Sequence, residues 1–460
     1  MKKELVVLST TAILGYGFPL SSFEEGMKYY PDVIAADAGS TDPGPYYLGA
    51  GYSFTDRSAV KRDLSVMIEA GVNHKIPVII GTAGGSGAAP HVAEVVEIVK
   101  EISAEKNLSF KAAVIHSDID KNLVSKKNAE GKVLPLYPAP VLTQQDIDDS
   151  KRIVAQMGVE PYIAALDAGA EVIIAGRSYD PAVFSAVPVW KGYDMGLATH
   201  MGKILECACI ACTPGSGSDC MLGILGEDYF KVRPLNKIRK ATTLSVAAHT
   251  LYEKTNPYIL PGPGGYLDLS QTKFEQVDEN TVKVTGSRFV KSDKYTIKLE
   301  GVKCTGYRTV SIAGARDPIF ISKIDEIIAG VRERVADNFK SANYKYELEF
   351  KIYGINGVMG ELEPVKNPHP HELGIVIDCV APTQEIANTI CGFTRSTMLH
   401  YGYTDRKATA GNLAFPYSPS DFKVGPVYEF SVYHVMEVDD PCSEFPRTMI
   451  YFDKGTTKEM

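Results

Sequence analysis

The sequence is poor in the features that mark membrane, secreted and nucleic-acid-binding proteins. It has no run of about 18 apolar residues, the length that a membrane-spanning helix needs. Its eight cysteines are too few and too irregularly spaced for a disulfide scaffold, so we expect reduced thiols and a cytoplasmic protein. Lysine and arginine form no basic block, and the formal net charge is −8. This balance argues against a nucleic-acid partner and against an anionic membrane surface.

What is present suits a globular enzyme with more than one domain, because 460 residues exceed what one hydrophobic core usually serves. In residues 1–270, short β-branched runs alternate with longer amphipathic segments, which is typical of an α/β domain. The strands are almost wholly apolar, so we expect a parallel sheet with helices on both faces. The predicted strands are residues 5–9, 33–37, 78–81, 112–116 and 171–176, and the predicted helices are 57–71, 90–105, 143–158 and 198–212.

The pattern changes near Pro261, where a cluster of prolines and glycines is followed by alternating strands and hairpins. From residue 307 onward the order becomes strand, helix, strand, strand, helix. This succession predicts a smaller, ferredoxin-like α+β domain in residues 271–460.

Polar loops follow the predicted parallel strands. Ligands bind beyond the carboxyl ends of such strands, so we expect these loops to meet in one candidate active site. The loops contribute Asp37, Ser40, Thr41 and Asp42 after the second strand, His116 after the fourth, and Arg177, Ser178 and Asp180 after the fifth.

A glycine-rich turn, TAGGSGAAP, joins the third strand to a helix and contains Gly84, Gly85, Ser86 and Gly87. Free N–H groups at a helix start favour an anion, and glycine lets the backbone approach it closely. The turn therefore predicts a site for a carboxylate or phosphate, with a tight turn that holds no ligand as the alternative. Its spacing matches neither a dinucleotide fingerprint nor a P-loop, so we expect neither nicotinamide nor ATP.

The charged loop residues allow several roles. Arg177 could clamp a substrate carboxylate, or it could form an ion pair with Asp180. Asp37 and Asp42 could act as acid and base, hold a divalent metal ion, or cap turns. His116 could transfer a proton near neutral pH, or it could be a buried, satisfied histidine.

Two further groups invite a metal interpretation. An iron–sulfur or zinc site at Cys207, Cys209, Cys212 and Cys220 is one hypothesis, but their spacing favours buried, reduced cysteines. His249 and Glu253 are four residues apart on a predicted helix, so their side chains are neighbours on its surface. A simple contact between them is favoured over a shared metal ion.

Several stretches resemble the acyclic terpene utilisation protein family. The matching stretches are ADAGSTDPGPYYLGAG, GTAGGSGAAPHVAEVVEIVKE, IIAGRSYDPAVF, THMGKILEC, SVAAHTLYEKTNPYILPGPGGYLDL and RKATAGNLAFPYSPSD. The resemblance implies a cytosolic catabolic enzyme that acts on branched carboxylic acids or their coenzyme A thioesters. It also implies a small protein subunit as partner, because some relatives carry or accompany a further small domain. We therefore expect a hetero-oligomer.

The branched, unsaturated acids of this context imply a lyase of the hydratase type. The sharpest expectation is hydration of mesaconate to citramalate, with Asp37 or Asp42 as base, His116 as acid, and Arg177 with the glycine turn as anion anchor. One alternative is a C–C lyase acting on a 3-hydroxy-acyl-CoA. The other is a non-catalytic scaffold or regulatory subunit.

Overall fold

The computed structural model describes residues 4–252, 254, 256–407 and 409–460. The chain divides into two compact units: unit 1 is Met1–Lys303 with Phe430–Met460, and unit 2 is Cys304–Glu429. The predicted boundary at residue 270 differs from this division. The strands between residues 265 and 291 belong to sheets of unit 1, and the C-terminal segment returns to unit 1. Unit 2 is therefore an insertion within unit 1.

Parallel strands form the centre of the large sheet of unit 1, and they are the strands that the sequence predicts. They are nearly all buried, as expected of a sheet with both faces covered. Their order across the sheet is β1 (Leu5–Ser9), β2 (Val33–Asp37), β3 (Val78–Gly81), β7 (Val172–Ala175) and β4 (Ser109–Ile115). Their carboxyl ends meet at one edge, which places the candidate loops there.

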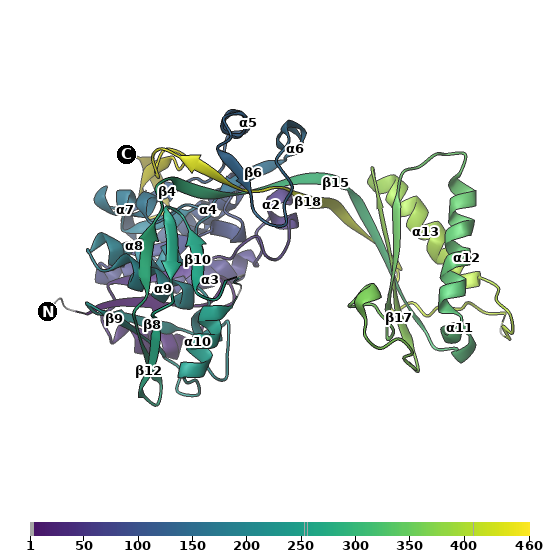
Figure 1. The fold of residues 1–460 in the computed structure, drawn as a ribbon, viewed down its shortest axis with the longest axis horizontal. Helices are drawn as coiled ribbons and strands as arrows, with labels where there is room; N and C mark the ends of the chain where they lie inside the picture. The colour runs from purple at the N-terminus through teal and green to yellow at the C-terminus, as the bar shows by residue number, and fades with distance from the viewer. Residues whose placement is uncertain (1–3, 253, 255, 408) are drawn as a thin grey trace. The chain divides into compact units, whose positions relative to one another are not determined.

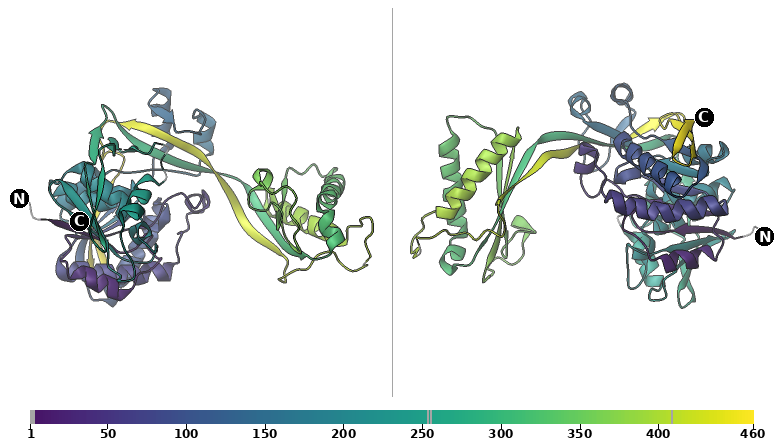
Figure 2. Two further views of the ribbon diagram at one scale, coloured as in Figure 1. Left: turned by 60° about the horizontal axis from the view of Figure 1, so that its bottom comes forward. Right: turned by 180° about the vertical axis from the view of Figure 1, so that it is seen from behind.

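Successive side chains of these strands enter two different hydrophobic cores, one on each face of the sheet. In β2, Val33 and Ala35 pack into one core, while Ile34 and Ala36 pack into the other. The second core includes α3 (Arg57–His74) and α4 (Ala89–Glu105), which cover one face (Figure 2, right). The first core includes helices that cover the opposite face, namely α7 (Glu160–Asp167), α8 (Asp180–Trp190) and α9 (Met195–Leu205).

Antiparallel strands extend both edges of this parallel centre. Beyond β1 lie β8 (Met221–Leu225), β9 (Tyr229–Pro234), β13 (Thr281–Thr285) and β12 (Lys273–Asp278). Beyond β4 lie β19 (Arg447–Asp453) and β20 (Thr456–Glu459). A small separate sheet holds β10 (Ile259–Gly262), β11 (Gly265–Asp268) and β14 (Arg288–Lys291).

Two long strands, β15 (Tyr295–Ala315) and β18 (Asp421–Val438), carry the chain into unit 2 and back (Figure 1). They are neighbours in one sheet, and in unit 1 they also pair with β6 (Arg152–Ala155) and β5 (Val133–Pro135). The helix predicted at residues 143–158 is therefore wrong in its second half. Only α6 (Gln144–Asp149) is helical, because the apolar run after it pairs with β15.

Unit 2 follows the predicted succession of elements from residue 307 onward. After β15 come α11 (Pro318–Ser322), α12 (Ile324–Phe339), β16 (Glu347–Tyr353), β17 (Leu373–Ala381) and α13 (Gln384–His400), and then β18. The strand order is β16, β17, β15, β18, and the helices pack on the sheet through their own hydrophobic core.

The remaining helices of unit 1 lie in its connections. They are α1 (Leu20–Met27), α2 (Tyr46–Ala50), α5 (Lys121–Ala129) and α10 (Thr243–Leu251). The predicted helix at 198–212 is wrong in its last turns, because α9 ends at Leu205 and a short 3₁₀ turn, Ala208–Ala211, follows. Within the described residues, none of the helices combines the length and apolarity needed to span a membrane.

Candidate functional site

A pocket of about 290 Å³ opens at the carboxyl edge of the parallel strands. Its walls come from the turn after β1, the loop after β2, the start of α8 and the segments that follow α9 and α10. Four acidic residues line it together with aromatic and small side chains. The acidic residues are Asp37, Asp42, Asp180 and Glu206, and the aromatic ones are Tyr16, Phe54 and Tyr252.

Asp37 lies at the end of β2 and is only 3% exposed. Its Oδ1 atom is buried and has no hydrogen-bond partner among the described residues. Burial is the main reason that the pKa of Asp37 is raised well above its ordinary value. The negative charge of Asp180 adds to this, while Arg177 and Thr82 oppose it. A raised pKa favours the protonated, neutral carboxyl, which is the form that can donate a proton into the pocket.

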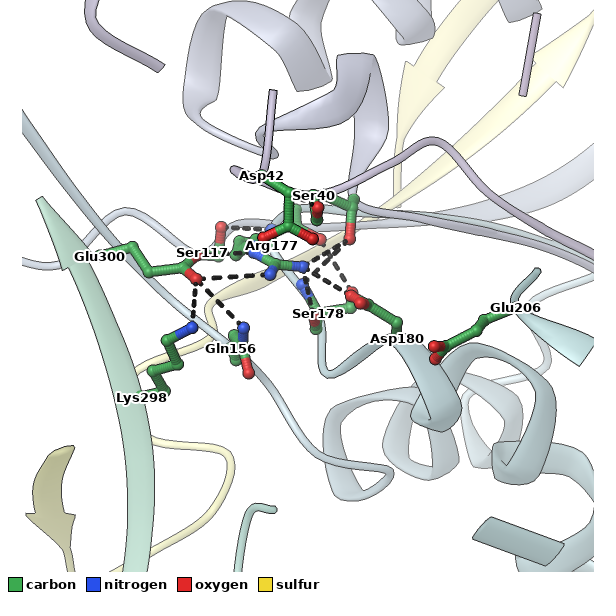
Figure 3. Close-up of polar contacts among 12 residues, drawn as sticks. Ser40, Asp42, Ser117, Gln156, Arg177, Ser178, Asp180, Glu206, Lys298 and Glu300 are labelled. Carbon is green, nitrogen blue, oxygen red and sulfur yellow. Dashed lines mark hydrogen bonds and ion pairs between the residues drawn. The ribbon is translucent and has the colours of Figure 1, made fainter. Parts of the chain in front are cut away.

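Arg177 follows β7 and is fully buried, with its guanidinium bonded to protein groups (Figure 3). Its Nε donates to Glu300 Oε2 at 2.7 Å, and its Nη1 donates to Asp180 Oδ1 and to the Ser178 carbonyl, each at 2.7 Å. The ion pair with Asp180 is the alternative that the sequence left open. Since these contacts occupy the guanidinium, its role here is to hold Asp180 at the pocket wall.

Glu300 comes from β15 and is fully buried. Besides Arg177, it is 2.9 Å from Lys298 Nζ and accepts a hydrogen bond from Gln156 at 3.2 Å. Burial raises the pKa of this carboxyl, but the charges of Arg177 and Lys298 outweigh burial and lower it to about 2. Glu300 is therefore an ionised carboxylate that balances the buried guanidinium.

Thr82, directly after β3, connects these groups through its hydroxyl. The Oγ1 atom accepts from the Ser178 N–H at 3.3 Å, and the hydroxyl also bonds with Asp37. Thr82 has φ +45°, a left-handed conformation that is unfavourable for a β-branched residue. Such strain persists only where surrounding contacts enforce it, and it concentrates at functional sites.

The glycine turn packs tightly beside this site, and its glycines are buried. Gly84, Gly85 and Gly87 all have positive φ. A Cβ added to Gly87 would lie 2.0 Å from the Arg177 backbone nitrogen, and one added to Gly85 would lie 2.7 Å from the Cβ of Phe54. The hydroxyl of Ser86 is buried without a hydrogen-bond partner among the described residues.

The start of α4, which the sequence offered as an anion site, already contacts a carboxylate of the protein. The N–H of Ala89 hydrogen-bonds with Asp118, a residue whose pKa is raised because it is buried. The positive end of the helix thus faces a protein side chain.

The other predicted residues divide between the pocket and its surroundings. Ser40 lines the pocket beside Asp42, and its hydroxyl accepts the Asp42 N–H at 3.2 Å, while Thr41 is buried in the same loop. Ser178 is buried and bonds with the Tyr162 hydroxyl at 2.6 Å. His116 is not among the described residues that line the pocket. Its backbone N–H donates to Pro446 beside β19.

The four cysteines around residues 207–220 are free thiols. Cys209, Cys212 and Cys220 are buried free thiols, and Cys207 is partly exposed. A hydrogen bond with Cys212 and burial raise the pKa of Cys209, whose thiol donates to the Cys220 carbonyl. Across the part of the chain that the structure describes, no three His, Cys, Asp or Glu side chains are placed to hold a metal. The metal hypotheses for the four cysteines and for Asp37 with Asp42 therefore gain no support from the arrangement of the described donors. Glu253 lies outside the described residues.

Sequence reasoning missed Thr82, Glu300 and Glu206. Glu206 lies just after α9 and pairs with Lys203 at 2.5 Å, and both are buried. Two charges three residues apart at the end of an apolar helix were a detectable signal. Glu300 gave only a weak signal, namely a carboxylate within an apolar strand, in a segment assigned to the other domain.

One comparison with known proteins gives a match. The family model described as "Acyclic terpene utilisation family protein AtuA" matches residues 50–219 and 239–411. Arg177, Asp180 and Glu300 lie within these ranges, whereas Asp37 and Asp42 lie before them. Neither a curated protein nor a solved structure matches the chain.

Proposed function

This chain belongs to the acyclic terpene utilisation family, and we propose that it is a cytoplasmic lyase of the hydratase type. Its substrate would be a small branched unsaturated carboxylate, with mesaconate as the specific candidate and citramalate as its product. The observation that carries the proposal is Asp37, a buried carboxyl with an unpartnered oxygen, beside Asp180 in a pocket at the carboxyl edge of the sheet.

Hydration of a double bond conjugated to a carboxylate needs a base that activates water and an acid that protonates the developing enolate. Asp37 suits the acid role, because burial raises its pKa and so favours the protonated carboxyl. Asp180 suits the base role, because it lines the same pocket and Arg177 fixes one of its oxygens at 2.7 Å. Two carboxyl groups in different environments thus divide the acid and base roles.

The size of the pocket favours a small acid over a bulky thioester. A volume of about 290 Å³ lies at the lower end of ordinary ligand sites, and little room remains for the nucleotide part of coenzyme A. A scaffold role is less consistent with the site, because a buried unpartnered carboxyl and a strained Thr82 both cost stability without serving packing.

The test follows the loss of enoate absorbance when the purified chain is incubated with mesaconate, alone and with a candidate small subunit. We expect turnover that falls by about 100-fold or more in Asp37→Asn and Asp180→Asn. Asp228→Asn is the matched control, because Asp228 is exposed in the turn between β8 and β9. Consumption of mesaconyl-CoA but not of mesaconate would correct the substrate. Turnover of neither compound would contradict the hydratase proposal.

A further inference from the structure

We propose that Lys254 is the anion anchor of this site and binds the carboxylate of the substrate beside the pocket. The inference rests on the proposed function for the identity of the substrate. It follows from three observations on the described residues: the expected anchors are occupied, a buried amine near the pocket has no hydrogen-bond partner, and one nitrogen of a neighbouring imidazole has none either.

The first observation is that protein carboxylates already contact both expected anchors. Glu300 and Asp180 bond the guanidinium of Arg177, and Asp118 bonds the N–H of Ala89 at the start of α4. A substrate anion would have to displace a buried protein carboxylate from either group, which is costly. The cation that binds substrate must therefore be another one.

The second observation is the environment of Lys254. Its Nζ is buried and makes no hydrogen bond to any other described residue. Lys254 lies in the segment that follows α10, two residues after Tyr252, which lines the pocket. Burial and the nearby charge of Lys203 lower the pKa of Lys254 to about 8, although Glu206 acts in the opposite direction. A buried ammonium group that makes no hydrogen bond within the described chain retains the capacity to bind a ligand carboxylate directly.

The third observation is that His249, on α10, also presents a buried nitrogen without a partner. Its Nε2 has no hydrogen bond among the described residues, and its ring stacks on Tyr252 with the ring centres 5.4 Å apart. Burial and the charges of Lys203 and Lys254 lower the pKa of His249 to about 4, although a backbone bond with Lys203 opposes them. The neutral imidazole thus adds a polar contact and leaves the positive charge to Lys254.

Lys203 itself is not the anchor. Its ammonium pairs with Glu206 at 2.5 Å and lies 5.2 Å from the centre of the Tyr252 ring. The pair holds the ammonium of Lys203 near Lys254, where it disfavours a second positive charge. A bound anion would offset this repulsion. A bound carboxylate should therefore raise the pKa of Lys254 and draw a proton from solution.

The experiment uses methylsuccinate, a saturated dicarboxylate that a hydratase cannot turn over. Acetic anhydride is applied at pH 8 to the wild-type chain, and acetylation is mapped by mass spectrometry. We expect methylsuccinate to protect Lys254 but not Lys106, whose ammonium forms an exposed ion pair with Glu69. Calorimetry at pH 9 in two buffers of different ionisation enthalpy should show proton uptake on binding. Equal labelling of Lys254 with and without methylsuccinate would overturn the proposal.

Variants separate this inference from the proposed function. Lys254→Met should raise KM for mesaconate about 10-fold or more with a smaller change in kcat, and Lys254→Arg should restore part of the affinity. Lys106→Met is the control. If mesaconate is hydrated with unchanged KM in Lys254→Met, the anchor is wrong and the hydratase stands. If methylsuccinate protects Lys254 but mesaconate is not hydrated, the anchor stands and the hydratase is wrong.

Discussion

The Nε atom of Arg177 lies 2.7 Å from Oε2 of Glu300, although the two residues are 123 positions apart in the chain. Both side chains are buried, so the pair joins the loop after β7 to the strand β15 inside the protein. Because Arg177 also bonds Asp180, the position of one pocket carboxylate depends on a distant strand.

We predict that Glu300→Ala lowers the free energy of unfolding by about 3–5 kcal/mol, because it leaves a buried guanidinium without its main counter-ion. Urea unfolding followed by circular dichroism measures the change. Glu227→Ala, at an exposed turn residue, is the control and should change stability by less than about 0.5 kcal/mol. A loss for Glu300→Ala as small as that of the control would show that the pair contributes little.

The same carboxylate predicts how stability depends on pH. The pKa of Glu300 is about 2 in the folded protein and about 4.5 when unfolded, so the unfolded state binds the proton more readily. Its contribution is complete above pH 4.5 and is lost as pH falls from 4.5 toward 2. The decline in the unfolding midpoint over this range should be shallower in Glu300→Gln than in the wild type. Parallel pH curves for the two proteins would contradict the assignment.

Asp37→Asn should raise the stability of the protein while it lowers turnover. The folded pKa of Asp37 is raised, so its contribution to stability declines as pH rises above the unfolded value of 3.8. Asparagine resembles the neutral acid and escapes this loss. We therefore expect a higher thermal midpoint than wild type at pH 7, together with the loss of turnover described above. A lower midpoint would indicate that Asp37 is ionised and paired.

Two glycines with the same φ of +69° provide a matched test of packing against Arg177. A Cβ on Gly87 would meet the Arg177 backbone nitrogen at 2.0 Å, whereas one on Gly131 would meet nothing within 4 Å. Both Gly→Ala changes incur the left-handed backbone strain, but only Gly87→Ala adds a clash. Thermal unfolding should show Gly87→Ala to be less stable than Gly131→Ala by about 1–3 kcal/mol or more. Equal losses would mean that the turn can relax.

Removal of metal should leave the protein unchanged, because the described donors do not converge on a common point. Dialysis against EDTA and phenanthroline is expected to alter neither mesaconate turnover nor the thermal midpoint. Cys209→Ala should cost stability through lost packing but retain turnover. Activity that disappears with the chelator and returns with an added metal would contradict the prediction that no metal is needed.

The parallel centre of the fold could be predicted because each of its strands is an apolar run that leads into a polar loop. The same reasoning predicted that Asp37, Asp42, Asp180 and His116 lie together. The first three line one pocket, whereas His116 is not among its described lining residues. It could not place Glu300 there, because periodicity does not reveal which distant strand passes behind a loop. It also misassigned residues 152–155, since a short apolar run fits a strand or a helix until its pairing partner is known.

The contacts that the charged residues make were the least predictable part of the site. The position of Arg177 after a strand predicts a residue that binds a substrate carboxylate. Only the structure shows that its guanidinium already binds the carboxylates of Glu300 and Asp180. Lys254 lies in a stretch that resembles the family, but its lack of a hydrogen bond within the described residues could not be predicted from the sequence.

The segment Cys304–Glu429 begins and ends on adjacent strands, which gives it the properties of a removable cassette. Joining β15 to β18 by a short hairpin turn would close the backbone without disturbing any strand of the large sheet. Evolution or a protein engineer could therefore exchange this cassette for another one without removing any of the residues that line the pocket.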